Sequence, residues 1–142
     1  MAFCLFGTPE TWRGATARVG HAGVQVSAAT LTGVEAQYTP REVYDLLAGG
    51  EIQLVDVRQS YEHEAGRIAG DRLLELSDLA ARAQEIDRTK PVVFYCRSGA
   101  RSAMATQAFR RAGFEAYNLT GGLLEWQASG LPLEPAGGYV AD

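Results

Sequence analysis

Apolar residues of this chain recur in short unbroken runs that indicate buried β-strands. The clearest run is Val92–Tyr95, which follows Lys90-Pro91 and has no polar residue in alternate positions. Runs of this kind are typical of parallel strands that are covered on both faces. Gln53–Val57 and Phe114–Leu119 are predicted as further strands of the same sheet.

Between these strands the apolar residues recur at helical spacing. The first predicted helix has a full start signal, with Thr39 as N-cap, Pro40 at the first helical position and Glu42 completing a capping box. The residues expected on its buried face and at its end are Val43, Leu46, Leu47, Gly49 and Gly50.

Later segments of the chain predict further helices. One begins at Ser77 as N-cap, the next ends at Gly113, and the last runs from the Gly121-Gly122 turn to Gly130. The residues expected on the buried face of the first of these helices are Leu79, Ala83 and Ile86. Those of the second are Met104, Ala105, Ala108, Phe109 and Ala112, and that of the last is Trp126. The alternation of strands and helices predicts an α/β fold, with a mostly parallel central sheet and helices on both faces.

The loop directly after the strand Val92–Tyr95 carries the candidate chemistry. It consists of Cys96, Arg97, Ser98, Gly99, Ala100, Arg101 and Ser102. Ligands of parallel sheets bind beyond the carboxyl ends of the strands, which is where this loop lies. Its backbone N–H groups and the start of the next helix converge on one point and stabilise an anion there. We therefore expect Cys96 to be a nucleophilic thiolate rather than a small buried apolar residue.

The other residues of the loop suit the binding of an anion. The guanidinium forks of Arg97 and Arg101 match an oxyanion with two accessible oxygens, although Arg101 alternatively holds the loop through backbone carbonyls. Ser98 and Ser102 have hydroxyls within reach of the sulfur, and Ser102 alternatively caps the following helix. Gly99 is expected to supply a backbone conformation that other residues avoid.

Charged residues near the end of the second strand are candidate supporting groups. Asp56 and Arg58 are expected to pair with each other or with an arginine of the cysteine loop, in a buried ion pair that fixes the loop, and Glu62 is expected to act similarly. His21 and His63 have no second ligand at a metal-binding spacing. We therefore expect no metal site.

Several short motifs are spread over about Tyr38 to Leu133. They are Val55-Asp56-Val57-Arg58, Glu62, Gly66-Arg67-Ile68, the cysteine loop, Leu119-Thr120-Gly121-Gly122, Trp126, Gly130 and Pro132. In their order and spacing these motifs resemble the single-domain rhodaneses. The chain departs from the family at Arg67, where His is usual, and at Ala69-Gly70-Asp71, where Pro-Gly-Ala is usual. The resemblance implies a rhodanese-like fold and a sulfurtransferase that carries sulfur as a persulfide on Cys96, without a cofactor.

The resemblance also implies the substrates. A sulfane-sulfur donor such as thiosulfate would load Cys96, and cyanide, a thiol or a protein would accept the sulfur. A persulfide carrier domain without small-molecule turnover remains an alternative. Cysteine phosphatases and arsenate reductases also use a thiolate in an anion-binding loop. Four residues, 97–100, separate Cys96 from Arg101, and the common phosphatase loop has one more. The shorter loop therefore fits a single sulfur atom better than a tetrahedral phosphate.

Composition and charge limit the partners and the cellular location that we expect for the protein. The chain has 142 residues, a net charge of −4 and a pI near 5.2. Nucleic acid is an unsuitable partner for it, because phosphate binding needs a basic face. Met1–Phe6 lacks the features of a signal peptide, and Val19–Val34 is interrupted by polar residues, so we expect no membrane span and a cytoplasmic protein. Cys4 and Cys96 are too few for a disulfide framework.

We divide the chain into an extension of unknown role, residues 1–37, and a rhodanese-like domain, residues 38–142. Within the extension, Val24, Val26 and Ala28 alternate with other residues, which hints at a strand, and His21-Ala22-Gly23 suits a turn. The simplest interpretation is a segment that packs on the sheet edge or is partly disordered.

Overall fold

The computed structural model describes residues 36–142, which form an α/β fold around one sheet. The strand order is β1-β5-β4-β2-β3, and all pairs of neighbouring strands are parallel. The strands are β1 (Gln37–Tyr38), β2 (Gln53–Asp56), β3 (Arg72–Leu73), β4 (Val92–Tyr95) and β5 (Ala116–Leu119). The predicted fold class is confirmed. Cys4 and the strand and turn predicted between residues 21 and 28 lie outside the described residues.

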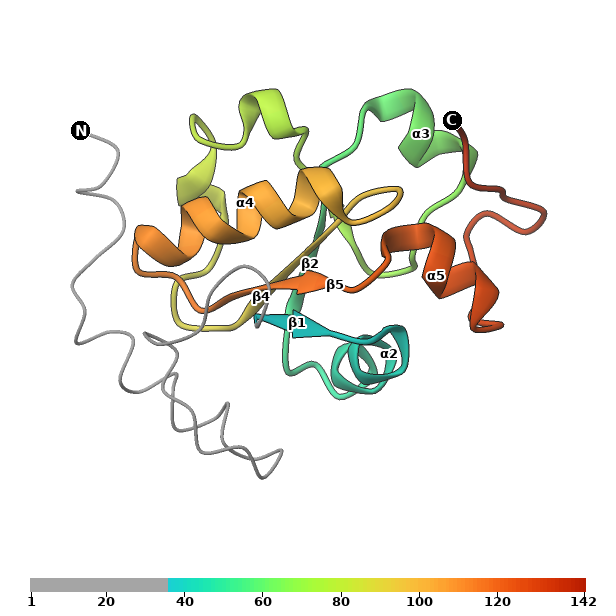
Figure 1. Cartoon of the computed structure of the whole chain (residues 1–142), viewed down its shortest axis with the longest axis horizontal. Coiled ribbons are helices and arrows are strands. Elements are labelled where there is room, and N and C mark those ends of the chain that lie inside the picture. Colours follow the sequence, from blue (N-terminus) through green and yellow to red (C-terminus); the bar gives the residue numbers. More distant parts are fainter. Residues whose placement is uncertain (1–35) are drawn as a thin grey trace.

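Helices cover both faces of the sheet, as the apolar run in β4 predicts. They are α2 (Pro40–Ala48), α3 (Ser60–Ala65), α4 (Ala100–Arg111) and α5 (Gly122–Ala128), with short 3-10 segments η4 (Leu76–Asp78) and η5 (Ala83–Glu85). Val92 and Phe94 of β4 pack on the side of α4 and the 3-10 segments, whereas Val93 and Tyr95 pack on the side of α2 and α5. Figure 1 shows α4 above the sheet and α2 below it.

Helix α2 begins with the capping box that the sequence predicts at Thr39. The Thr39 hydroxyl accepts a hydrogen bond from the Glu42 N–H, and the Glu42 carboxylate accepts one from the Thr39 N–H. Gly49 follows the last helical residue. Val43 is fully buried on the face of this helix that covers the sheet. The local signals therefore suffice to define this helix.

The single helix predicted after Ser77 is wrong, because the segment forms η4 and η5 instead. The backbone of Arg82 leaves the helical region, with φ −113° and ψ 18°, and separates the two turns. Leu79, Ala83 and Ile86 are nevertheless buried together in the core. Two short turns already place these side chains, so packing overrides helical propensity here.

Helix α4 begins at Ala100, and its buried face differs from the predicted one. Met104 is 62% exposed and Ala108 is also exposed, whereas Ser102 and Thr106 are buried beside Ala105 and Phe109. Thr106 Oγ1 donates to the Ser102 carbonyl at 2.8 Å, which satisfies the buried hydroxyl. The prediction is confirmed for Ala105 and Phe109 and wrong for Met104 and Ala108, because it counted apolar residues only and Ser102 and Thr106 take buried positions.

The remaining differences are in short elements. Strand β5 begins at Ala116 rather than Phe114, whose ring packs instead on Phe109 at 4.8 Å between centroids. Strand β1 includes Gln37, the last residue assigned to the extension. The sequence analysis did not anticipate β1, β3 or α3. None of the helices in residues 36–142 has both the length and the apolar character needed to cross a bilayer.

Candidate active site

The sulfur of Cys96 lies at the carboxyl end of β4 and is held by backbone N–H groups. The side chain is 1% exposed, and Sγ accepts hydrogen bonds from Gly99 N at 3.1 Å and from Ser102 N at 3.4 Å. Gly99 has φ +104°, a left-handed conformation that a residue with a Cβ rarely adopts. This turn aims the amides at the sulfur and leads directly into α4. The arrangement stabilises a negative charge on sulfur.

Ser102 and Asn118 form a polar pair behind the sulfur. Ser102 Oγ lies 3.3 Å from Cys96 Sγ and 2.6 Å from Asn118 Oδ1, and its single proton serves one of these acceptors at a time. Asn118 Nδ2 donates to the Gly99 carbonyl at 3.2 Å. Both side chains are buried. Asn118 therefore orients the hydroxyl and braces the loop, a role that sequence reasoning missed although a lone polar residue in an apolar strand was the available signal.

The two loop serines differ in position. Ser98 is exposed, and the hydroxyl within hydrogen-bond distance of the sulfur is that of Ser102. Ser102 does not cap α4, since Gly99 is the N-cap. Ala100 is exposed at the first helical position. Its N–H belongs to the first turn, whose N–H groups have no intrahelical acceptor.

The start of α5 supports the loop from the other side. Leu123 N donates to the Cys96 carbonyl at 2.8 Å, and Leu124 N donates to the Arg97 carbonyl at 3.0 Å. Gly122 has φ +63°, and a Cβ there would lie 2.6 Å from both of these carbonyl oxygens. Only glycine permits this approach. The Gly121-Gly122 turn thus anchors the cysteine loop through its backbone.

Arg101 braces the loop through a carboxylate rather than through backbone carbonyls. Its Nη1 and Nη2 donate to Glu62 Oε2 and Oε1 at 2.9 and 3.0 Å. Burial by itself raises the pKa of Glu62, but the hydrogen bonds from Arg101 and the Gln59 N–H hold that pKa below its ordinary value. Glu62 therefore stays ionised and ties α3 to the start of α4.

Asp56 and Arg58 pair with each other and not with an arginine of the loop. Arg58 Nε and Nη2 donate to Asp56 Oδ1 and Oδ2 at 2.9 and 2.7 Å, and both side chains are fully buried. Arg58 Nη2 also donates to the Gly66 carbonyl at 2.7 Å. Burial lowers the pKa of Arg58, but the hydrogen bonds and charge of Asp56 raise it above its ordinary value. The pair fixes the segment around α3, so it acts on the loop through Glu62.

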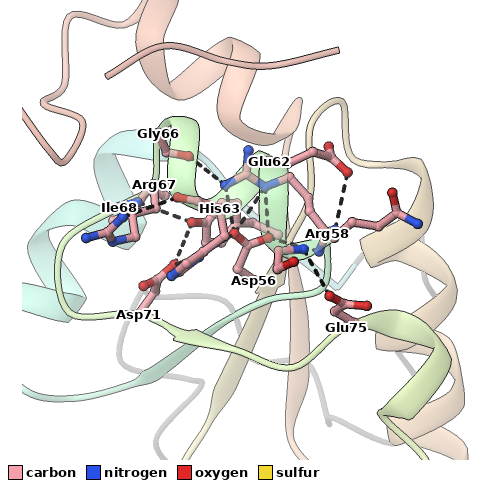
Figure 2. A network of polar contacts seen from close by, with 12 residues as sticks. Asp56, Arg58, Glu62, His63, Gly66, Arg67, Ile68, Asp71 and Glu75 are labelled. Atoms are coloured by element: carbon pink, nitrogen blue, oxygen red, sulfur yellow. Dashed lines mark hydrogen bonds and ion pairs between the residues drawn. The ribbon is translucent and has the colours of Figure 1, made fainter. Parts of the chain in front are cut away.

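His63 joins this network, as Figure 2 shows. Its Nδ1 lies 3.0 Å from Asp56 Oδ2 and 3.5 Å from Asp71 Oδ2, and its side chain is 17% exposed. Burial raises the pKa of Asp71 to about 6, although the hydrogen bond from Tyr95 and the charge of His63 act in the opposite direction.

Asp56, His63 and Asp71 are the group of described residues whose donor atoms are close enough to hold a metal ion. The oxygens that face His63 are already bonded. Asp56 Oδ2 accepts from Arg58, and Asp71 Oδ2 accepts from the Tyr95 hydroxyl at 2.6 Å. We interpret the group as a hydrogen-bond network that supports α3. Sequence spacing missed it, because Asp71 lies in a different loop from His63.

Arg97 points toward the carboxyl-terminal segment of the chain. Its Nη2 donates to Asp142 Oδ1 at 2.8 Å. The Arg97 side chain is 35% exposed, so part of it is open to solvent. The two loop arginines are thus placed differently, since one is held by a buried carboxylate and the other by an exposed one.

A parallel sheet with a cysteine at the end of a central strand defines an α/β protein whose cysteine loop directs backbone N–H groups at the sulfur. The family model described as the Rhodanese-like domain matches residues 39–129. The chain belongs to the rhodanese-like family.

Individual relatives agree with this assignment. Uncharacterized protein YqhL of Bacillus subtilis (strain 168) is 47% identical over 75 residues, which cover 52% of this chain and 60% of that protein. Thiosulfate sulfurtransferase GlpE of Coxiella burnetii (strain RSA 331 / Henzerling II) is 32% identical over 93 residues, covering 65% of this chain and 87% of that protein. The chain thus spans only about three fifths of the length of YqhL.

A solved structure confirms the fold. The rhodanese-related protein TVG0868615 of Thermoplasma volcanium superposes with a TM-score of 0.65 at 25% sequence identity. The match covers 68% of this chain and 95% of that chain. The shared part is therefore nearly all of a small rhodanese-related domain.

Proposed function

We propose that the protein is a sulfurtransferase that moves a sulfane sulfur from thiosulfate or a related donor to a thiophilic acceptor through a persulfide on Cys96. The observation that carries this proposal is the pair of N–H groups, from Gly99 and Ser102, directed at a buried sulfur at the start of α4. Family membership and the sulfurtransferase named among the relatives support it.

The first half-reaction would load the cysteine. The Cys96 thiolate attacks the outer sulfur of thiosulfate, a new S–S bond forms, and sulfite leaves with the electron pair of the broken S–S bond. In the second half-reaction cyanide or a thiolate attacks the outer sulfur, and Cys96 leaves as the thiolate. Electrons balance within each displacement, so the reaction needs no redox cofactor.

The loop residues would act in different ways. The amides of Gly99 and Ser102 hold the inner sulfur, and the first-turn amides of Ala100 and Arg101 are available to the outer one. Such preorganised donors replace water around the charge. Arg97 binds the anionic group of the donor, whereas Arg101, fixed by Glu62, positions the loop.

Turnover with small molecules distinguishes a free enzyme from a carrier domain. A thiol or a protein cysteine would receive the sulfur in either case, and a carrier would show little turnover with small molecules. We further propose a reducing cytoplasmic setting, because a catalytic thiol must remain unoxidised between turnovers.

Steady-state assays with thiosulfate, using cyanide in one series and a thiol acceptor in another, test the proposal. We expect turnover in both series, its loss in Cys96→Ser and its retention in Cys4→Ser. Full activity of Cys96→Ser would exclude the persulfide route. Hydrolysis of a phosphotyrosine analogue without sulfur transfer would instead favour a cysteine phosphatase.

A further inference from the structure

The carboxyl-terminal segment Glu134–Asp142 is packed along the residues that follow α3 and extends to the cysteine loop. Glu134 and Arg67 exchange backbone hydrogen bonds at 2.8 Å each, and Tyr139 N donates to the Ala65 carbonyl at 2.9 Å. Gly66 leaves no room for a Cβ, which would lie 2.8 Å from Tyr139 N. Figure 1 shows the chain end beside α3. The segment therefore has a defined path.

Asp142 links this segment to the loop. Its backbone carbonyl accepts a hydrogen bond from the Tyr61 hydroxyl of α3 at 2.7 Å, and its Oδ1 accepts one from Arg97 Nη2 at 2.8 Å. The contacts place the Asp142 carboxylate between α3 and the cysteine loop.

Asp142 accepts a hydrogen bond from only one of the two donors, Nε and Nη2, on one edge of the Arg97 guanidinium. Its Nε is buried and has no hydrogen-bond partner among residues 36–142. The Nε and Nη2 edge of an arginine binds two oxygens of one anion side by side, as Arg58 binds Asp56. Asp142 contacts Nη2 alone, so this edge of the Arg97 guanidinium retains a buried donor without a partner among the described residues.

The second loop arginine provides the contrast. Arg101 makes two hydrogen bonds to Glu62, whose side chain is 3% exposed. The Asp142 side chain is 96% exposed and accepts one hydrogen bond from within residues 36–142, that of Arg97 Nη2. Exposed ion pairs are weak and easily displaced. Arg97 is therefore the loop arginine that an incoming anion can take over.

We propose that Asp142 is a specificity-determining residue, which occupies the Arg97 edge that an oxyanion donor must take. This inference rests on the proposed sulfur-transfer function. A sulfonate group has several oxygens and fills both Nε and Nη2, so it displaces Asp142. Donors without an oxyanion gain nothing at Arg97. The Asp142 carboxylate thus competes with multi-oxygen anions for Arg97. Removing its charge strengthens the binding of these anions.

Asp142→Asn tests this proposal, with Glu134→Gln as the matched control. Glu134 is an exposed acid in the same segment that holds Arg67 through its backbone, so its substitution removes the same charge without touching Arg97. We expect the thiosulfate KM to fall on the order of two- to fivefold in Asp142→Asn, the range of an exposed ion pair, with kcat unchanged. The KM of Glu134→Gln should match that of the wild type.

A chemical probe keeps the test independent of sulfur transfer. The rates at which iodoacetate and iodoacetamide alkylate Cys96, followed by peptide mass spectrometry, compare an anionic with a neutral reagent at the same sulfur. The ratio of the two rates should rise in Asp142→Asn, stay constant in Glu134→Gln, and lose its dependence on Asp142 when Arg97 is also changed to Ala.

The results separate the two proposals. A raised KM in Asp142→Asn, or an alkylation ratio equal to that of Glu134→Gln, would overturn the role of Asp142. If no variant transfers sulfur but the ratio changes as expected, the proposed function fails and the competition at Arg97 stands.

Discussion

Arg101 of α4 and Glu62 of α3 form a bidentate ion pair, with N–O distances of 2.9 and 3.0 Å, although they lie 39 positions apart in the sequence. The Glu62 side chain is nearly buried and that of Arg101 is 37% exposed. The pair connects the network around Asp56 and Arg58 to the first turn of the helix that holds the sulfur. Charged residues distant from Cys96 are thereby coupled to the geometry of its loop.

Breaking this pair should destabilise the protein. Glu62→Gln is expected to lower the free energy of unfolding by about 1 to 2 kcal/mol, a value reduced for the solvent exposure of Arg101. Denaturant unfolding at pH 7 measures it. Glu85→Gln, which breaks the exposed Arg82–Glu85 pair, is the control and should change stability little.

The pH dependence provides a check on the same variant. Because the pKa of Glu62 is lowered in the fold, its stabilisation is complete above the ordinary value of 4.5 and is lost as the pH falls through the lowered pKa. The stability difference between wild type and Glu62→Gln should therefore shrink in acid. A constant difference from pH 7 to pH 3 would contradict this assignment.

Gly122→Ala should distort the cysteine loop. The substitution carries the left-handed backbone cost of about 1 to 2 kcal/mol and a further cost of about 1 to 3 kcal/mol for overpacking against the Cys96 and Arg97 carbonyls. Gly130→Ala is a matched control, since Gly130 has φ +78° but nothing within 4 Å of a built Cβ. Thermal melts should show the larger loss for Gly122→Ala. Equal losses would mean that the contact with the loop is unimportant.

Asn118→Asp should reduce the reactivity of Cys96 at pH 7 and above. The change keeps the shape of the side chain but removes the Nδ2 donor to the Gly99 carbonyl and adds negative charge behind the sulfur. Iodoacetamide alkylation of Cys96 is expected to slow by an order of magnitude or more, about 1.4 kcal/mol per factor of ten. A rate equal to that of the wild type would show that Asn118 does not influence the reactivity of Cys96.

Asp71 should give the protein a second pH signature. Its pKa is raised from 3.8 to about 6, so its carboxyl favours folding most when protonated, and this contribution is lost as the pH rises through about 6. The Tm of Asp71→Asn relative to wild type should therefore increase between pH 4 and pH 7 and level off above. A relative Tm that falls over this range would contradict the raised pKa.

Local signals in the sequence were enough for much of this architecture. The capping box at Thr39, the apolar run of β4 and the cysteine loop each consist of neighbouring residues whose chemistry is legible without the fold. Strand β3 has two residues and α3 has six, so neither is long enough to show a periodicity.

The contacts that build the site were not predictable in the same way. Ser102 meets Asn118 across 16 positions, and Arg97 meets Asp142 across 45, so their spacing carries no local signal. The sequence allows Asp56 and Arg58 more than one partner, and the tertiary fold decides between them because Glu62 of α3 takes Arg101. The identities of these residues were visible in the sequence, but their pairing depends on tertiary structure.

The most direct test of the account is the intact mass of the protein after incubation with thiosulfate. If Cys96 carries the transferred sulfur, the mass should increase by one sulfur atom, and cyanide should reverse the increase. Cys4→Ser should behave as the wild type, and Cys96→Ser should remain unmodified. An unchanged wild-type mass, or the same adduct on Cys96→Ser, would contradict a persulfide on Cys96.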